Sequence, residues 1–151
     1  RLTVDMNRRA LLAGTGTMLA ALAGCTSTVS SSALAHTVSI YLRERDETHD
    51  VTVLIENEQG EPLFEREYRL SDANEAHEDA TFPASADPAT VVVTVDRTRF
   101  DYQWPGVEAA ELPCEGQNRS GLEVYVGSDP DGSPDLRLDA NCQHVTIEAS
   151  G

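Results

Sequence analysis

The sequence predicts an all-β protein, an antiparallel β-sandwich of seven to nine short strands. From His36 onward, apolar residues recur at every second position, and residues typical of turns separate these stretches about every 8–12 residues. No segment after His36 has the long 3.6-residue apolar period of an amphipathic helix. The chain has no internal repeat, so a single domain over residues 36–151 is expected. An up-and-down barrel is the alternative.

Up to nine segments have the strand pattern, in which β-branched and aromatic residues alternate with polar ones. In chain order, the expected strands cover residues 36–43, 51–56, 63–70, about 80–82, 90–96, 99–104, 122–126, 136–138 and 145–148. The polar residues 71–78 are expected to form mainly a loop, and residues 105–120 form the longest irregular stretch. Because binding residues concentrate on loops, we expect residues 105–120 to make the contacts of the domain.

The strand expected at 99–104 has an aromatic face. Phe100, Tyr102 and Trp104 are two positions apart and therefore point to the same side of a strand. We expect these three rings to form the aromatic centre of the core. A tight turn at residues 97–98 is expected to precede this strand.

The first 24 residues have the features of a signal peptide. Arg8 and Arg9 precede an uncharged apolar run, 10–24, that is shorter than the roughly 20 residues a membrane-spanning helix needs. The adjacent arginines indicate export by the twin-arginine route. Residues 1–5 add nothing to such a signal, so Met6 is interpreted as the true start.

The end of the apolar run predicts a lipid attachment site. Leu22-Ala23-Gly24-Cys25 resembles the lipobox of exported lipoproteins, in which the cysteine thiol receives a lipid before cleavage. The resemblance implies a protein anchored through Cys25 to the outer face of the cytoplasmic membrane. Residues 25–35 are rich in serine and threonine and are expected to form a flexible tether. The alternative is an ordinary thiol behind a plain signal or a short anchor.

The charge of the chain excludes one class of partner. From Cys25 onward there are 25 acidic residues and 8 arginines, a net charge of −17, and the whole chain has no lysine. Nucleic-acid binding needs clustered cations, so no nucleic-acid partner is expected. The regular strands argue against disorder, and the acid is interpreted as a solvated surface. This composition resembles that of salt-in haloarchaeal proteins and implies salt-dependent folding, because molar salt shortens the Debye length to about 3 Å.

A family resemblance concerns the run from His36 through Trp104. With Gly-Glu-Pro-Leu-Phe-Glu-Arg-Glu-Tyr at 60–68 and Val-Thr-Val-Asp at 93–96, it is similar to small secreted immunoglobulin-like (Ig-like) domains of haloarchaeal lipoproteins. The resemblance implies an Ig-like or fibronectin-III-like sandwich at the cell surface. It brings no assigned reaction.

The two cysteines of the expected domain predict a disulfide. With Cys25 assigned to the lipid, Cys114 and Cys142 are left, and a pair in an exported domain favours a bond between them. The alternative is two free thiols.

Residues 129–135, Asp-Pro-Asp-Gly-Ser-Pro-Asp, are a candidate ion site. Asp129, Asp131 and Asp135 stand at the first, third and seventh positions, which resembles part of a calcium loop built from carboxylate oxygens around a glycine turn. The full twelve-residue loop and its closing glutamate are missing. Asp, Pro and Gly are also favoured in β-turns, so a plain hairpin turn is the alternative, and no cofactor is firmly predicted.

Asn118-Arg119-Ser120 is an N-glycosylation sequon in an expected exposed loop. Asn118 is therefore a candidate modification site in an exported protein. The alternative is a loop that fits the three-residue pattern without carrying a glycan.

The sequence lacks the usual catalytic motifs. It contains no Gly-x-Ser-x-Gly elbow and no glycine-rich phosphate loop before a helix, and its serines crowd the tether. Both methionines lie in the leader region and the histidines are scattered, so neither a blue-copper nor a structural zinc site is expected. The four histidines are His36, His49, His77 and His144. We expect a non-enzymatic protein.

The sequence thus predicts a lipid-anchored, extracytoplasmic binding or structural module at a haloarchaeal cell surface. Its partners would be the membrane, through the lipid, and an unknown cell-surface protein or glycan. One alternative is an ion- or solute-binding lipoprotein that uses residues 129–135. Another is an accessory subunit of an envelope or membrane complex, in which an edge strand of the sandwich pairs with a partner.

Overall fold

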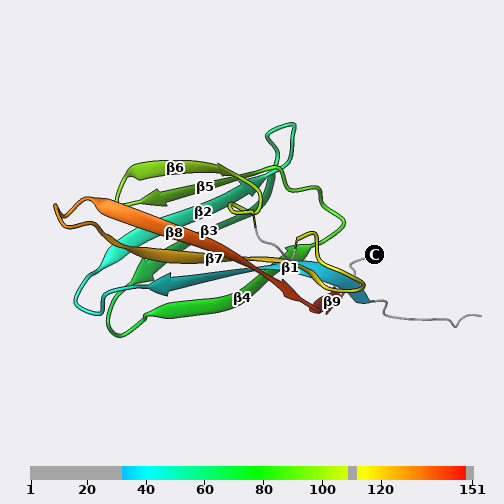
Figure 1. Ribbon diagram of the computed structural model, residues 1–151, viewed down its shortest axis with the longest axis horizontal. Helices are drawn as coiled ribbons and strands as arrows, with labels where there is room; N and C mark the ends of the chain where they lie inside the picture. Colours follow the sequence, from blue (N-terminus) through cyan, green and yellow to red (C-terminus); the bar gives the residue numbers. More distant parts are fainter. Residues whose placement is uncertain (1–31, 109–111, 149–151) are drawn as a thin grey trace, which may run out of the picture. The chain divides into compact units, whose positions relative to one another are not determined.

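The structure, a computed structural model, describes residues 32–108 and 112–148. Within these ranges the chain forms nine β-strands in two packed sheets (Figure 1). The strands are β1 (Ser32–Leu42), β2 (His49–Glu56), β3 (Pro62–Leu70), β4 (Ala76–Pro83), β5 (Thr90–Val95), β6 (Thr98–Gln103), β7 (Arg119–Ser128), β8 (Pro134–Gln143) and β9 (Thr146–Glu148). The predicted all-β sandwich is confirmed. No helix of the described ranges is long and apolar enough to cross a bilayer.

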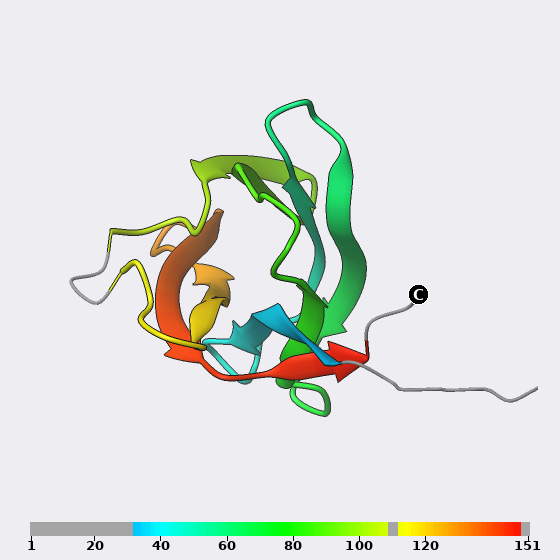
Figure 2. The ribbon, with the colours of Figure 1, turned by 90° about the vertical axis from the view of Figure 1, so that its right-hand side faces the viewer.

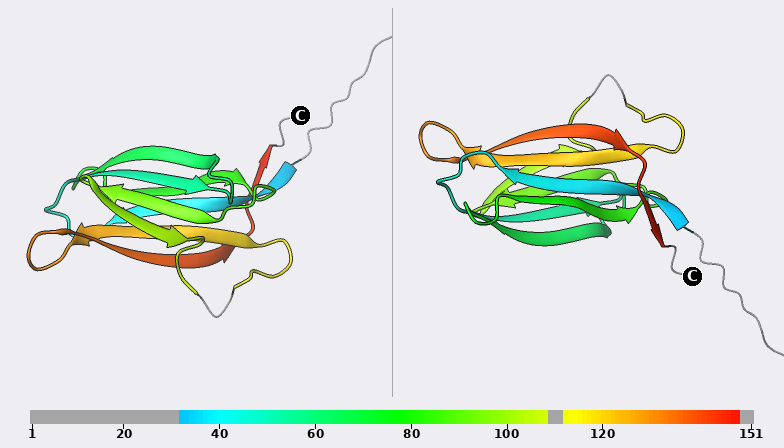
Figure 3. Two further views of the ribbon diagram at one scale, coloured as in Figure 1. Left: turned by 90° about the horizontal axis from the view of Figure 1, so that it is seen from above. Right: turned by 90° about the horizontal axis from the view of Figure 1, so that it is seen from below.

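The two sheets have the strand orders β4-β1-β7-β8 and β3-β2-β5-β6, and β9 pairs with the beginning of β1. Figure 3 shows them as two separate layers. Every pairing among the described strands is antiparallel except that of β1 with β7, in which Thr37 lies opposite Gly121 and Leu42 opposite Val126. The predicted sandwich is therefore not purely antiparallel. Its strand order also differs from the ABED and CFG sheets of immunoglobulin constant domains, because β1 and β2 lie in different sheets.

The core lies between the sheets and follows the alternation in the sequence. Val51, Val53 and Ile55 of β2 are at most 2% exposed, while the residues between them are partly exposed. The central strands β1, β2, β5 and β7 supply most of the buried side chains. The core residues are Val38, Ile40, Val51, Val53, Ile55, Phe64, Tyr68, Leu70, Phe82, Val91, Val93, Val95, Leu122, Val124, Val126 and Leu138.

Several strand boundaries differ from the prediction; β7 is longer at both ends than the expected 122–126, and β8 covers ten residues where 136–138 were expected. β1 begins at Ser32, so residues 32–35, expected in the tether, belong to the domain, where Ala33 pairs with Ile147 of β9. β4 covers eight residues where a strand of about three was expected, because most of its side chains are polar or exposed and give little apolar alternation. The loop before β4 is shorter than predicted and contains a tight turn from Ser71 to Asn74.

The aromatic centre of the core also differs from the prediction. The Trp104 ring lies 5.5 Å from that of Phe82, which in turn lies 5.9 Å from that of Phe64 (centroid distances). Phe100, Tyr102 and Trp104 are all partly buried and pack against the core from the edge of its sheet, but ring contacts with Phe82 are formed by Trp104. The centre is therefore assembled from three separate parts of the chain.

The turn between β5 and β6 lies one residue earlier than predicted. Val95 pairs with Thr98, so the turn consists of Asp96 and Arg97. Their φ angles are 48° and 80°, the left-handed values that a two-residue type I′ hairpin needs. Most such turns contain glycine or asparagine, and an arginine at the second position requires support from its surroundings.

Candidate binding groove beside residues 104–118

The long connection between β6 and β7 lies at the end of the sandwich where β1 begins. This position follows from the parallel pairing of β1 with β7, which places the starts of both strands at the same end. Residues 57–61 and 84–89 turn at this end as well, and Figure 2 looks onto it. We call it the groove end. The opposite end, formed by residues 43–48, 71–75, 96–97 and 129–133, is called the hairpin end.

A groove of about 820 Å³ opens at the groove end. Its lining residues are Tyr102, Gln103, Trp104, Pro105, Gly106, Val107, Glu108, Leu112, Pro113 and Ser120. Trp104, Val107 and Leu112 provide apolar walls, and among the described lining residues Glu108 alone is charged. An open, largely apolar groove with a few polar groups is the usual form of a binding site.

Two contacts fix the segment that forms the groove. The predicted disulfide between Cys114 and Cys142 is present and joins the segment to β8. Gly106 packs against the same strand, where a Cβ atom would lie 2.4 Å from Leu138 Cδ1. The φ angle of Gly106 is 100°, so only glycine combines this backbone with so close an approach.

Two lining residues of the groove, Trp104 and Ser120, contact a buried histidine, His36. The His36 ring lies 5.1 Å from the rings of both Phe82 and Trp104, and its Nδ1–H donates to the Ser120 carbonyl oxygen at 2.9 Å. Burial lowers the pKa of His36 more than this hydrogen bond raises it, so the ring is neutral at pH 7. The backbone N–H of Trp104 donates to the Ala89 carbonyl oxygen at 2.9 Å. These contacts fix the position of Trp104 in the lining of the groove.

The carboxylates of Asp129 and Asp131 in the candidate calcium loop lie in hydrogen-bonding contact with each other. Asp129 Oδ1 accepts the backbone N–H groups of Asp131 and Ser133, each at 3.2 Å, and Asp131 Oδ1 accepts that of Ser133 at 2.9 Å. The Asp135 carboxylate instead pairs with Arg43 at 2.7 Å. The part of the chain that the structure describes contains no group of three or more His, Cys, Asp or Glu residues that could hold a metal ion. These carboxylates stabilise the hairpin turn.

The remaining predicted sites fall in two groups. Asn118 is exposed at the end of a turn, where its carbonyl and that of Gly116 accept hydrogen bonds from Arg119 at 2.8 and 2.9 Å. Its glycosylation stays a prediction. Cys25 and the pair Arg8–Arg9 lie outside the described residues.

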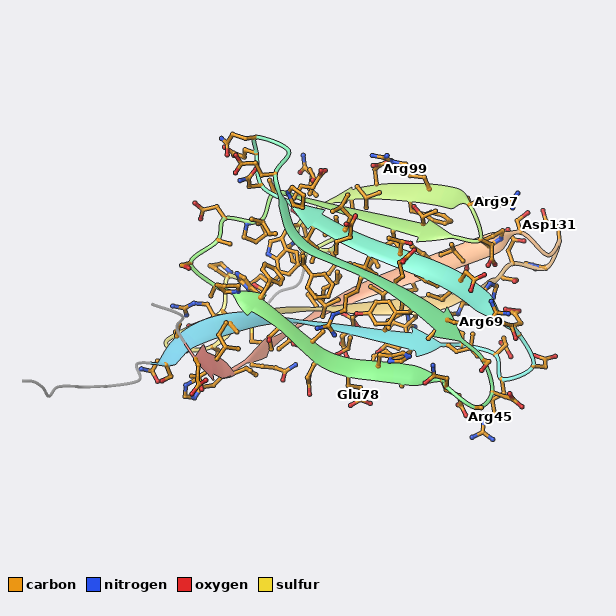
Figure 4. The ribbon with its side chains drawn as sticks, turned by 180° about the vertical axis from the view of Figure 1, so that it is seen from behind. Arg45, Arg69, Glu78, Arg97, Arg99 and Asp131 are labelled. Atoms are coloured by element: carbon orange, nitrogen blue, oxygen red, sulfur yellow. A yellow bond between two sulfur atoms is a disulfide. The ribbon has the colours of Figure 1, made fainter. Side chains whose placement is uncertain are left out.

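An ionic cluster at the hairpin end was not expected from any sequence pattern. His49, with a side chain only 6% exposed, contacts Asp96 through Nδ1 at 2.5 Å and Glu47 through Nε2 at 2.9 Å. Three arginine–carboxylate pairs join other strands and loops of this end. Figure 4 shows two of these arginines, Arg45 and Arg69, together with Arg97 of the 96–97 turn. The pairs are Arg43–Asp135 at 2.7 Å, Arg45–Glu75 at 3.0 Å and Arg69–Asp50 at 2.7 Å. Because His49 and Asp96 are 47 positions apart, no local pattern could have linked them.

Comparison of the chain with protein-family models, with curated proteins and with solved structures finds no match in any of the three.

Proposed function

We propose that the chain is a lipid-anchored, extracytoplasmic binding module without enzymatic activity. In this proposal, Cys25 carries the lipid and the groove beside residues 104–118 recognises a protein at the membrane surface of a salt-adapted cell. The groove is the observation that carries the proposal. On a domain of strongly negative charge, the described residues of its lining contribute one carboxylate, Glu108, beside apolar walls. In molar salt, charged contacts are screened, and apolar contacts of this kind remain.

The position of the groove favours a partner close to the membrane. Ser32, the first residue of β1, follows Cys25 by seven residues, which span at most about 25 Å when fully extended. A lipid on Cys25 would therefore keep Ser32, which lies at the groove end, within about 25 Å of the bilayer surface. This reach favours a membrane protein, as in an accessory subunit, over a soluble ligand captured far from the membrane.

The disulfide supports the proposed compartment. A bond between Cys114 and Cys142 is stable in an oxidising environment such as the cell exterior, and thiols inside most cells are kept reduced. The bond also anchors the groove segment to β8, which limits the ordering that a partner would have to impose.

Anchoring is tested by phase separation. Full-length protein expressed in a salt-adapted host should partition into the detergent phase, and the Cys25→Ser variant should move to the aqueous phase. Equal partitioning of the two proteins would contradict the lipid anchor.

Recognition is tested by site-specific photo-crosslinking in native membranes at molar KCl. A crosslinker at position 107 should give a discrete adduct, and a Leu112→Asp substitution should abolish it. The matched control is Pro130→Asp, which adds the same charge at the exposed tip of the hairpin end. If Pro130→Asp reduced the adduct as much as Leu112→Asp, or if position 107 gave no adduct, the groove would not be the binding site.

A further inference from the structure

His49, the first residue of β2, has its ring between two carboxylates. Nδ1 lies 2.5 Å from Asp96 Oδ2 and Nε2 lies 2.9 Å from Glu47 Oε1. Ionised carboxylates only accept hydrogen bonds, so both ring nitrogens must donate. The observed geometry therefore requires a doubly protonated, positively charged ring in a side chain that is only 6% exposed.

The cluster joins segments that are distant in the chain. Glu47 belongs to the segment after β1, and its Oε1 also accepts the hydroxyl of Ser128 on β7 at 3.1 Å. Asp96 belongs to the turn between β5 and β6, and its Oδ1 accepts the Asp50 N–H at 2.9 Å. The Asp96 N–H donates to the Asp50 carbonyl oxygen, also at 2.9 Å. The bonds of His49 thus connect both sheets at the hairpin end.

The same cluster supports an unfavourable backbone. Asp96 and Arg97 both have left-handed φ angles, 48° and 80°, and neither is glycine. Such residues persist only where the surroundings fix them. The Asp96 side chain supplies this support, because one carboxylate oxygen binds His49 and the other binds the Asp50 N–H.

We propose that the cluster of Glu47, His49 and Asp96 is a pH-sensitive lock, which keeps the 96–97 turn and the 43–48 segment together while His49 is positively charged. When the His49 ring loses one proton, the lone pair of that ring nitrogen faces the carboxylate of Asp96 or Glu47. The hydrogen bond between the two groups then breaks. When Nδ1 loses its proton, the turn loses one of the two side-chain bonds that fix its left-handed backbone, and the bond from the Asp50 N–H is left to hold it alone.

The direction of the pH dependence follows from the charges that act on His49. Burial favours the neutral ring, but the hydrogen bonds and negative charges of Glu47 and Asp96 outweigh it and raise the pKa of His49 above 6.5. Asp50 and its ion-pair partner Arg69 come next in the network. A raised pKa in the folded state means that the lock is complete below about pH 6.5 and opens as the pH rises through the folded-state value.

Opening would change a second groove. A polar groove of about 800 Å³ lies over β3, β2 and β5, and Asp50, Arg69, Asp96 and Arg97 are among its lining residues. The locked turn places Asp96 and Arg97 in one wall of this groove. Release of the turn would therefore alter the charged surface at the hairpin end without disturbing the groove end.

The test is an NMR titration of the disulfide-bonded full chain in about 2 M KCl. The His49 ring should titrate above pH 6.5, and over the same range the Asp50 amide should exchange faster than the intrinsic rise with pH. The Val93 amide, in the centre of β5, should stay protected. A His49 ring that titrates at or below pH 6.5, or an Asp50 amide that follows the intrinsic rise alone, would overturn the lock.

Variants separate the lock from general stability. His49→Gln should remove the pH step in Asp50 exchange, and the matched control His144→Gln, at an exposed position before β9, should keep it. If His49→Gln does not fold, the titration of the unaltered protein still decides. A pH step that persists in folded His49→Gln would assign it to another group and overturn the lock.

Discussion

The rings of Tyr41 and Tyr125 stack across the parallel pairing of β1 with β7, with centroids 5.1 Å apart and planes inclined by 20°. The guanidinium of Arg137, on β8, lies 4.5 Å from the centroid of the Tyr125 ring. The register places these residues in one row across three strands, on the face of the sheet away from the core. These ring and cation–π contacts link β1, β7 and β8 on the outer face of their sheet, which does not pack against the core.

Replacing Tyr125 tests this row. Tyr125→Ala removes a cross-strand ring pair and a cation–π contact and should lower the free energy of unfolding by about 1–2 kcal/mol. Denaturant unfolding at fixed molar KCl measures the change. Tyr125→Phe keeps both ring contacts and should stay within about 0.5 kcal/mol of the unaltered protein. Equal losses in the two variants would assign the effect to the hydroxyl.

Removal of the disulfide should destabilise the domain. Cys114 and Cys142 are 28 positions apart, and closing a loop of that length restricts the unfolded chain by about 3–4 kcal/mol. The double variant Cys114→Ser/Cys142→Ser should therefore unfold at a lower denaturant concentration, and the reduced, unaltered protein should match it. Identical unfolding of the oxidised and reduced proteins would contradict this prediction.

The stability of the domain should increase with salt. The charge of −17 destabilises the compact state through self-repulsion, and molar salt screens it. The exposed pair Arg45–Glu75 will weaken in salt, but surface pairs contribute only about 0–1 kcal/mol. The melting temperature should therefore rise between dilute buffer and about 2 M KCl. A melting temperature that falls or stays constant would show that repulsion between carboxylates does not limit the stability of the folded domain.

Calcium should leave the stability unchanged. Asp135 is paired with Arg43, and the carboxylates of Asp129 and Asp131 accept backbone N–H groups of their own turn. Melting curves with calcium and with a chelator, at one ionic strength, should superimpose. A rise in melting temperature with calcium that is lost in Asp129→Asn would instead support an ion site at residues 129–135.

The local parts of the fold could be predicted from the sequence. Residues 90–95 are six consecutive β-branched residues, and this run defines β5 without knowledge of its neighbours, although Val92 between the core residues Val91 and Val93 is also buried. Apolar alternation did not reveal the full length of β4, because Phe82 is the one buried residue of this strand. Apolar alternation reports burial, so a strand that buries little gives a weak signal.

Contacts between distant residues could not be predicted in the same way. Alternation shows that β1 and β7 are strands, but it does not reveal that they pair or run parallel. For the candidate site, composition and context predicted the disulfide and the long irregular segment that lines the groove, since both have local signals. The cluster around His49 depends on three short segments that meet only in the folded state.

The central position of β1 determines the order in which this domain can assemble. All the neighbours of β1 follow it in the chain, and contacts such as His36 with Ser120 join residues 84 positions apart. The hairpins β2–β3 and β5–β6 can form early from nearby residues, whereas the pairing of β1 with β7 must wait until β7 has been synthesised. During that interval the edge of β1 that pairs with β7 is open. A ribosome-bound chain that ends before β7 should therefore be far more prone to aggregation than the finished protein.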